Sequence, residues 1–264
     1  AGGGVEGGVV AYQVGWFFFL APYGIIAQPI HTTILPELVA DNLAGNTEAF
    51  KASIRWSLDS MCVLLLPLSA LCAALSVPAM SVLAFGSADV SNGIAMLSVS
   101  LATLGLGLLP YGVFFLLARV FYVYDNSRTP AMAGAAVAAV GVTIMALAAV
   151  FADGTNLVMM LGLAHSAAFL VGSMVLTVAL RLKVGAWVLP SLLGRSLGCS
   201  AIAGLISWFC YEQWDPQSKL GQTVALLILT ALTLGIYVGL IRLVGVSVTK
   251  RIPRGGVPRQ EIKN

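Results

Sequence analysis

Residues 119–152 read RVFYVYDNSRTPAMAGAAVAAVGVTIMALAAVFA: a short charged stretch, followed by residues 131–152 with no charged side chain. An apolar run of about 20 residues is long enough to cross the hydrocarbon core of a membrane as an α-helix. The stretch therefore predicts a membrane-spanning helix over 131–152 with a charged connection at its start.

Six further apolar stretches of similar length flank this one. They lie at 9–38, 56–84, 93–118, 157–180, 188–211 and 221–245. Hydrophobic residues make up 59% of the chain and charged residues 9%, whereas a soluble domain has about 25% charged residues. We therefore expect an all-α polytopic membrane protein with seven transmembrane helices.

The basic residues lie almost entirely on alternate connections between these stretches. Of the 14 Lys and Arg residues, only Lys219 lies on the other set of connections. The remainder are Lys51, Arg55, Arg119, Arg128, Arg181, Lys183, Arg195, Arg242, Lys250, Arg251, Arg254, Arg259 and Lys263. Because cytoplasmic loops are enriched in Lys and Arg, we expect a multi-pass cell-membrane (inner or plasma membrane) protein with a cytoplasmic C-terminus and an extracytoplasmic first residue. The net charge of +3 then reflects topology, and no nucleic-acid partner is expected.

The first apolar stretch carries three prolines at seven-residue intervals, Pro22, Pro29 and Pro36. A proline inside a helix removes one backbone donor and bends the helix. The polar residues Gln28 and His31 lie between these prolines. The pattern fits either a bent packing helix or a hinge that borders a cavity.

The first charged connection contains a second group of candidate residues. Asp59 follows Arg55 by four residues, a spacing that permits an ion pair on one face of a helix. The alternative is that Asp59 faces a cavity open to the cytoplasm. Glu37 and Asp41 lie at the same predicted membrane face and are candidates for the same cluster.

Motifs of soluble enzymes are absent from the sequence. It contains no P-loop, no G-x-S-x-G and no H-E-x-x-H. The spacing of His, Cys and Asp matches no metal site, so neither a metal nor a cofactor is expected. The segment 194–198, GRSLG, is typical of close helix packing in membranes. Kinked, glycine-rich helices with polarity near one face are typical of transporters.

The side chains of the connection before residue 131 indicate two possible roles for it. Arg119 and Arg128 flank Asp125, which can pair with either arginine. Thr129 and Pro130 suit the N-cap and first position of the next helix. The connection is either a topological anchor that starts this helix, or an inner gate whose ion pairs break during transport.

Residues 119–130, which include Phe121 and Tyr122, resemble the signature of the MurJ/MviN family, the lipid II flippases of peptidoglycan synthesis. The segments APYG at 21–24 and TTILPEL at 32–38 are also similar to that family, as is Trp56 with its apolar run to Pro67. The resemblance covers almost the whole chain.

The resemblance implies a 14-span fold of two six-helix lobes with two extra C-terminal helices, in which this chain supplies spans 8–14. It divides the chain into most of the second lobe (1–184), the two extra helices (185–248) and a basic cytoplasmic tail (249–264). It implies a bacterial, non-enzymatic membrane transporter that moves lipid II, a polyprenyl-pyrophosphate-linked glycopeptide, from the inner to the outer leaflet by alternating access. Further partners would be membrane lipids and the missing N-terminal half, and the last two helices would form a hydrophobic groove for the polyprenyl tail.

The chain departs from the family pattern at two places. Asp59 stands where family members commonly carry a basic residue, and residues 144–146 read IMA where the family has a polar segment. Two other functions stay open at this point. One is a related exporter of drugs or other polyprenyl-linked glycans, and the other is a non-transporting membrane scaffold for cell-wall enzymes.

Overall fold

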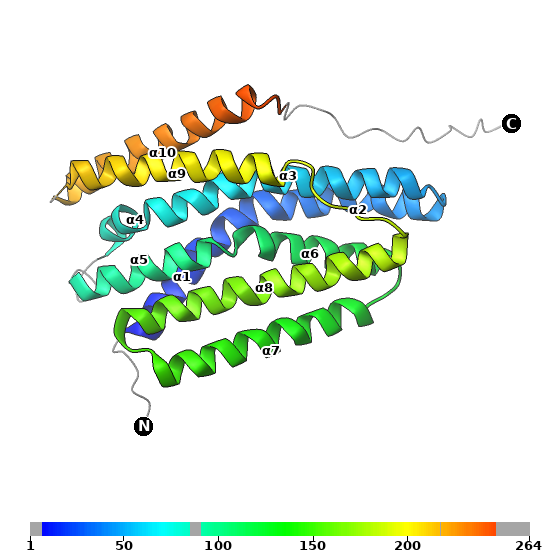
Figure 1. Cartoon of the computed structure of the whole chain (residues 1–264), viewed down its shortest axis with the longest axis horizontal. Coiled ribbons are helices and arrows are strands. Elements are labelled where there is room, and N and C mark those ends of the chain that lie inside the picture. Colours follow the sequence, from blue (N-terminus) through cyan, green and yellow to red (C-terminus); the bar gives the residue numbers. More distant parts are fainter. Residues whose placement is uncertain (1–6, 85–90, 217, 247–264) are drawn as a thin grey trace, which may run out of the picture.

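The computed structural model describes residues 7–84, 91–216 and 218–246, and every regular element in these ranges is helical (Figure 1). The elements are α1 (Gly8–Pro22), the π-helix η1 (Tyr23–Ala27), α2 (Gln28–Leu43), α3 (Thr47–Ala74), α4 (Ser76–Leu83), α5 (Ser91–Gly105), α6 (Leu108–Val123), α7 (Arg128–Phe151), α8 (Gly154–Val184), α9 (Leu193–Trp214) and α10 (Lys219–Leu243). The predicted basic tail at 249–264 lies outside the described residues.

The described residues contain six helices that are long and apolar enough to cross a membrane. The bent pair α5 and α6 makes a seventh span if it is counted as one. The first span is the continuous run α1–η1–α2, Gly8–Leu43, which has 36 residues. The prediction of an all-helical membrane protein is therefore confirmed.

Two predicted spans are interrupted. The stretch predicted at 93–118 bends by 44° between α5 and α6. Glycines beside the bend allow close packing there, because a Cβ at Gly105 would lie 2.5 Å from Cβ of Cys72, and a Cβ at Gly107 would lie 2.6 Å from Oγ of Ser166. The stretch predicted at 56–84 begins earlier, at Thr47, and α3 ends at Ala74 before the short α4.

Two helices organise the bundle. The long helix α8 packs against α1, α5, α6 and α7, while α3 packs against α2, α5, α6 and α9. Glycines allow these helices to approach closely: a Cβ at Gly162 of α8 would overlap the side chain of Thr103 of α5. Large apolar side chains such as Phe19, Phe50 and Phe121 are almost fully buried between the helices.

Helices α9 and α10 form a pair that lies along α3 and α4 (Figure 1). The hydroxyls of Ser207 and Thr233 share a hydrogen bond of 2.5 Å between the two helices. The predicted packing motif at 194–198 makes no close contact, because a Cβ at Gly194 or Gly198 would meet no atom within 4 Å. Gly204 provides the close approach instead, against Ala70 of α3.

Candidate functional site

The proline-rich first span contains a π-helix at its centre. Residues Tyr23–Ala27 form η1 between Pro22, the last residue of α1, and Gln28, the first residue of α2. Pro29 follows in the first turn of α2 and Pro36 lies inside it. Since prolines withdraw backbone donors, the ordinary α-helical ladder is disturbed here, and single π-turns of this kind are frequent at functional sites. The structure thus places an irregular segment where the sequence pattern fitted either a bent packing helix or a hinge.

A polar cluster joins this segment to α6. Arg119 donates through Nη2 to Oε1 of Gln28 over 3.0 Å, and through Nη1 to Nδ1 of His31. A guanidinium can only donate, so Nδ1 of His31 accepts and carries no proton. His31 is fully buried, and its ring lies edge-on to that of Tyr23, with 5.9 Å between centroids. The cluster is therefore a cation held by two neutral acceptors.

The predicted ion pairs of Asp125 are absent among the described residues. Arg119 points to α2, and both Asp125 and Arg128 are exposed without an ion pair. Asp125 instead ends α6: it has a positive φ of 54°, and Asn126 N–H donates to the carbonyl of Phe121 over 3.0 Å. Asp tolerates this left-handed conformation better than most residues, so its role at this corner is conformational.

The start of α7 also differs from the prediction. Thr129 is not the N-cap, because α7 begins at Arg128 after Ser127. Asn126 binds the first turn, since its Oδ1 accepts from Thr129 N–H over 3.1 Å and its Nδ2 donates to Thr129 Oγ1 over 3.0 Å. Pro130 is buried in that turn. Sequence reasoning missed Asn126, although an Asn three residues before a Thr at a helix start is a recognisable capping pattern.

The same corner is tied to the first span. Asn42 of α2 donates through Nδ2 to the carbonyl of Val123 at the end of α6 over 3.3 Å. Phe121 is buried in the core, whereas Tyr122 is 55% exposed. The corner between α6 and α7 and the end of α2 are thus linked by an Asn that the sequence did not single out.

Asp59 corrects the prediction for the first charged connection. It forms no ion pair with Arg55, which is exposed; the ion pair found among the described residues is Lys51–Glu48. Asp59 accepts from Leu192 N–H over 2.8 Å and from Ser191 Oγ over 2.7 Å. A carboxylate that accepts from backbone N–H at a helix start acts as a cap, so Asp59 fixes the beginning of α9.

Glu37 and Asp41 do not join Asp59 in one cluster. Asp41 accepts a long hydrogen bond of 3.5 Å from Ser53 Oγ. Glu37 is half-buried on α2. In the ranges that the structure describes, no three His, Cys, Asp or Glu side chains come together as metal ligands.

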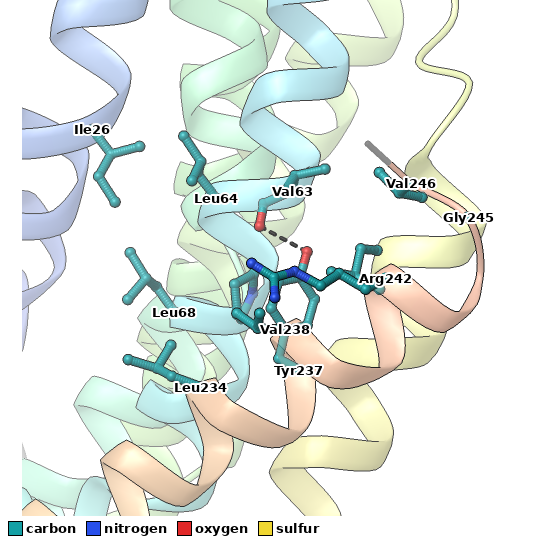
Figure 2. A pocket seen from close by; sticks show the side chains of 12 residues that line it. Ile26, Val63, Leu64, Leu68, Leu234, Tyr237, Val238, Arg242, Gly245 and Val246 are labelled. Carbon is teal, nitrogen blue, oxygen red and sulfur yellow. Dashed lines mark hydrogen bonds between the residues drawn. The ribbon is translucent and has the colours of Figure 1, made fainter. Parts of the chain in front are cut away.

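An apolar groove of about 770 Å³ borders the π-helix at Ile26 (Figure 2). Its walls come from η1, α3 and α10, and from the two residues that close the described chain: Ile26, Val63, Leu64, Pro67, Leu68, Leu234, Tyr237, Val238, Ile241, Arg242, Gly245 and Val246. Tyr237 donates through its hydroxyl to the carbonyl of Val63 over 2.7 Å, which fixes α10 to α3. The groove was expected between the last two spans, but α9 contributes no lining residue.

These features define a class. A broken, proline-bent helix that borders an apolar groove and a partly buried cation, within a bundle of membrane-spanning helices, is the architecture of a membrane carrier.

Comparison with known proteins specifies the family. The family model of the lipid II flippase MurJ matches residues 5–237, and the chain therefore belongs to the MurJ family. A solved structure of a lipid II flippase MurJ in an inward closed conformation is similar in fold, with a TM-score of 0.69 and 20% sequence identity. The match covers 91% of this chain and 48% of the solved protein, so the chain spans about half the length of that protein.

Proposed function

We propose that this chain forms the C-terminal half of a carrier that moves lipid II from the inner to the outer leaflet of the bacterial cell membrane by alternating access. The support is its membership of the lipid II flippase family and its likeness to about half of a solved flippase. On this proposal, residues 1–184 belong to the second lobe, residues 185–248 are two additional helices, and residues 249–264 are a cytoplasmic tail. The carrier moves its substrate without making or breaking a bond, so it is not an enzyme.

The observation that carries the proposal is the position of the π-helix. Ile26 of η1 lines the apolar groove, and Gln28, two residues later, binds Arg119. A lipid-linked sugar has an apolar tail and a charged, polar headgroup, and the hinge segment lies between surfaces that suit the two. The groove keeps a polyprenyl tail among apolar side chains, while the headgroup passes on the polar side of the hinge.

The proposal replaces the ion-pair gate with a hydrogen-bonded one. Because Arg119 holds Gln28 and His31, it fixes the inner end of α6 to α2 directly after the π-helix. Asn42 adds a second tie between α2 and the end of α6. Rocking of the lobe about η1 would break and remake these bonds, and because none of them involves an acid, the movement requires no protonation of a carboxylate.

The proposal is tested by the need for both halves, because half of a carrier cannot enclose a headgroup. Residues 1–264 are reconstituted in liposomes containing fluorescent lipid II, alone or with the segment that corresponds to the other half of the solved relative. We expect no headgroup translocation by residues 1–264 alone and measurable translocation by the two halves together, read as accessibility of the dye to a membrane-impermeant quencher. Translocation by residues 1–264 alone would contradict the proposal. Two inserted halves that export a cationic drug and leave lipid II in place would identify a related exporter instead.

A further inference from the structure

His31 accepts its hydrogen bond from a cation, and this decides where its own proton lies. Arg119 can only donate, so Nδ1 of His31 offers it a lone pair and carries no proton. The neutral imidazole then has its one N–H at Nε2. That nitrogen is buried and has no hydrogen-bond partner among the described residues. While Arg119 is bound, His31 is therefore neutral, and one of its two nitrogens is left unsatisfied.

The described surroundings of His31 contain no acid that would stabilise a charged imidazole. The titratable side chains in contact with its ring are Arg119 from α6 and Tyr23 from η1. On α2 itself, Asp41 accepts from Ser53, and Glu37 lies about 9 Å further along the helix axis. An imidazolium in the closed cluster would therefore meet the like charge of Arg119 without a compensating carboxylate.

Helix α3 also packs against α2, and it supplies no counter-charge to His31 either. Its charged side chains within the described residues are engaged elsewhere or exposed: Lys51 pairs with Glu48, Asp59 caps α9, and Arg55 is exposed. The closed cluster thus excludes a proton from Nδ1 both by the bond to Arg119 and by its electrostatic surroundings.

We infer that His31 is a proton-binding site of the gate: Arg119 and a proton compete for the lone pair of Nδ1, so opening of the tie between α6 and α2 takes up one proton. When Arg119 withdraws, Nδ1 becomes free and water reaches both nitrogens of the ring. The proton comes from that water and returns to it when Arg119 binds again. Hydration of Nε2 also relieves a buried, unpaired N–H, which costs about 1–3 kcal/mol.

Gln28 shows what an acceptor without a proton site does. Its amide oxygen accepts from the same guanidinium over 3.0 Å, and an amide does not titrate. His31 adds a dependence on acid that a second glutamine would lack. The inference rests on the proposed function, because it takes the tie between α6 and α2 to be the gate of the carrier.

The sign of the effect follows from linkage between protonation and opening. A state that binds an additional proton gains population as the pH falls. An imidazole in water is half protonated near pH 6.5, so the equilibrium constant for opening should rise about tenfold between about pH 7.5 and about pH 5.5. Acid on the side where the gate opens therefore favours the open gate.

The test measures opening in residues 1–264 in nanodiscs, with the four native cysteines replaced by alanine and one reporter cysteine added. Leu38→Cys places the reporter two turns after His31 on the same face of α2, where Leu38 is fully buried. Val39→Cys, at a position that is 40% exposed, corrects for the effect of pH on the thiol reagent itself. We expect the ratio of the two labelling rates to rise about tenfold over this pH range, and to change less than about twofold in His31→Gln.

His165→Gln is the matched control for this measurement. His165 is the other histidine of the chain and is also buried, but aromatic rings surround it, and no arginine contacts it among the described residues. His165→Gln and Asp41→Asn should both keep the tenfold rise. A ratio that does not depend on pH in the reporter chain would overturn the inference. A rise that survives in His31→Gln, or that disappears in His165→Gln, would overturn it as well.

A second measurement leaves the gate and the native cysteines intact. Because the chain has two histidines, ¹⁵N-histidine labelling gives two imidazole spin systems in solid-state NMR, and His165→Gln assigns them. At about pH 7.5, His31 should show a protonated Nε2 and a bare Nδ1; a proton on Nδ1 would contradict the competition with Arg119. Two halves that fail to translocate lipid II while opening still depends on pH through His31 would contradict the proposed function and leave the proton site in place.

Discussion

Arg119→Met tests the polar cluster most directly, because its effects on stability and on transport are expected to differ. The substitution removes two hydrogen bonds to a charged group, and each is worth about 1.5–3 kcal/mol, which gives a loss of roughly 3–6 kcal/mol. It also removes a charge from a membrane-spanning helix, which on insertion scales offsets about 2.5–3.5 kcal/mol of that loss at the centre of a helix. This offset is smaller for Arg119, because Arg119 lies one turn before the end of α6 at Val123 and not at the centre of a helix. We expect a net destabilisation of roughly 1–3 kcal/mol.

The chain contains its own reporter for this measurement. Cys62 and Cys199 are free and buried, so a thiol-reactive dye labels them when the bundle unfolds. A loss of roughly 1–3 kcal/mol in the free energy of unfolding should lower the temperature at which half of the protein is labelled by roughly 5 °C. In the two-half liposome assay, the same variant should lose most of its lipid II translocation, because the tie between α6 and α2 is the proposed gate.

Two comparisons decide whether the reasoning holds. Arg128→Met removes an exposed arginine that has no ion pair among the described residues, and it should change neither the labelling midpoint nor transport. Arg119→Lys keeps the charge but loses the fork that reaches Gln28 and His31 together, so it should behave between wild type and Arg119→Met. Wild-type stability and transport in Arg119→Lys would refute the account, because charge alone would then suffice.

Two further substitutions test the packing of the bundle by the same dye-labelling measurement. Asp59→Ala removes the acceptor of Leu192 N–H, and the loss of this cap should cost about 0.5–2 kcal/mol; an unchanged midpoint would mean that α9 starts independently of α3. Gly162→Ala should cost about 1–3 kcal/mol, because the added Cβ overlaps the side chain of Thr103. Gly134→Ala, where a Cβ meets no atom within 4 Å, serves as its control and should be neutral or slightly stabilising.

The membrane-spanning helices could be predicted from the sequence because the bilayer sets their length and composition. The span predicted at 131–152 coincides with α7, Arg128–Phe151, within three residues at its start. The ends of the helices were predicted less accurately, because they depend on local capping interactions. Asp125 was interpreted as half of an ion pair, but the rule that Asn or Asp can occupy a left-handed position after a helix would have predicted its role.

The polar cluster and the walls of the groove could not be predicted, because they depend on contacts between distant segments. Arg119 and His31 are separated by 88 positions, and Asp59 and Leu192 by 133. The i,i+4 rule placed Asp59 beside Arg55 because it compares residues on one helix only. Asp59 binds the start of α9 because α9 packs against α3. The periodicity of the sequence does not show which helix packs against α3.

The arrangement of the groove walls indicates which part of the groove can move. Two walls are fixed to each other, since Tyr237 of α10 bonds to the Val63 carbonyl of α3, and α9, which is bonded to α10, packs on α3 through Gly204. The third wall is Ile26, which belongs to the π-helix between Pro22 and Gln28. A π-turn holds one extra residue in the helical ladder, and such turns are frequent at functional sites. A change in groove width is therefore expected to come from η1, and the same movement carries Gln28 toward or away from Arg119. Release of the tail and opening of the polar cluster would then be two consequences of one hinge.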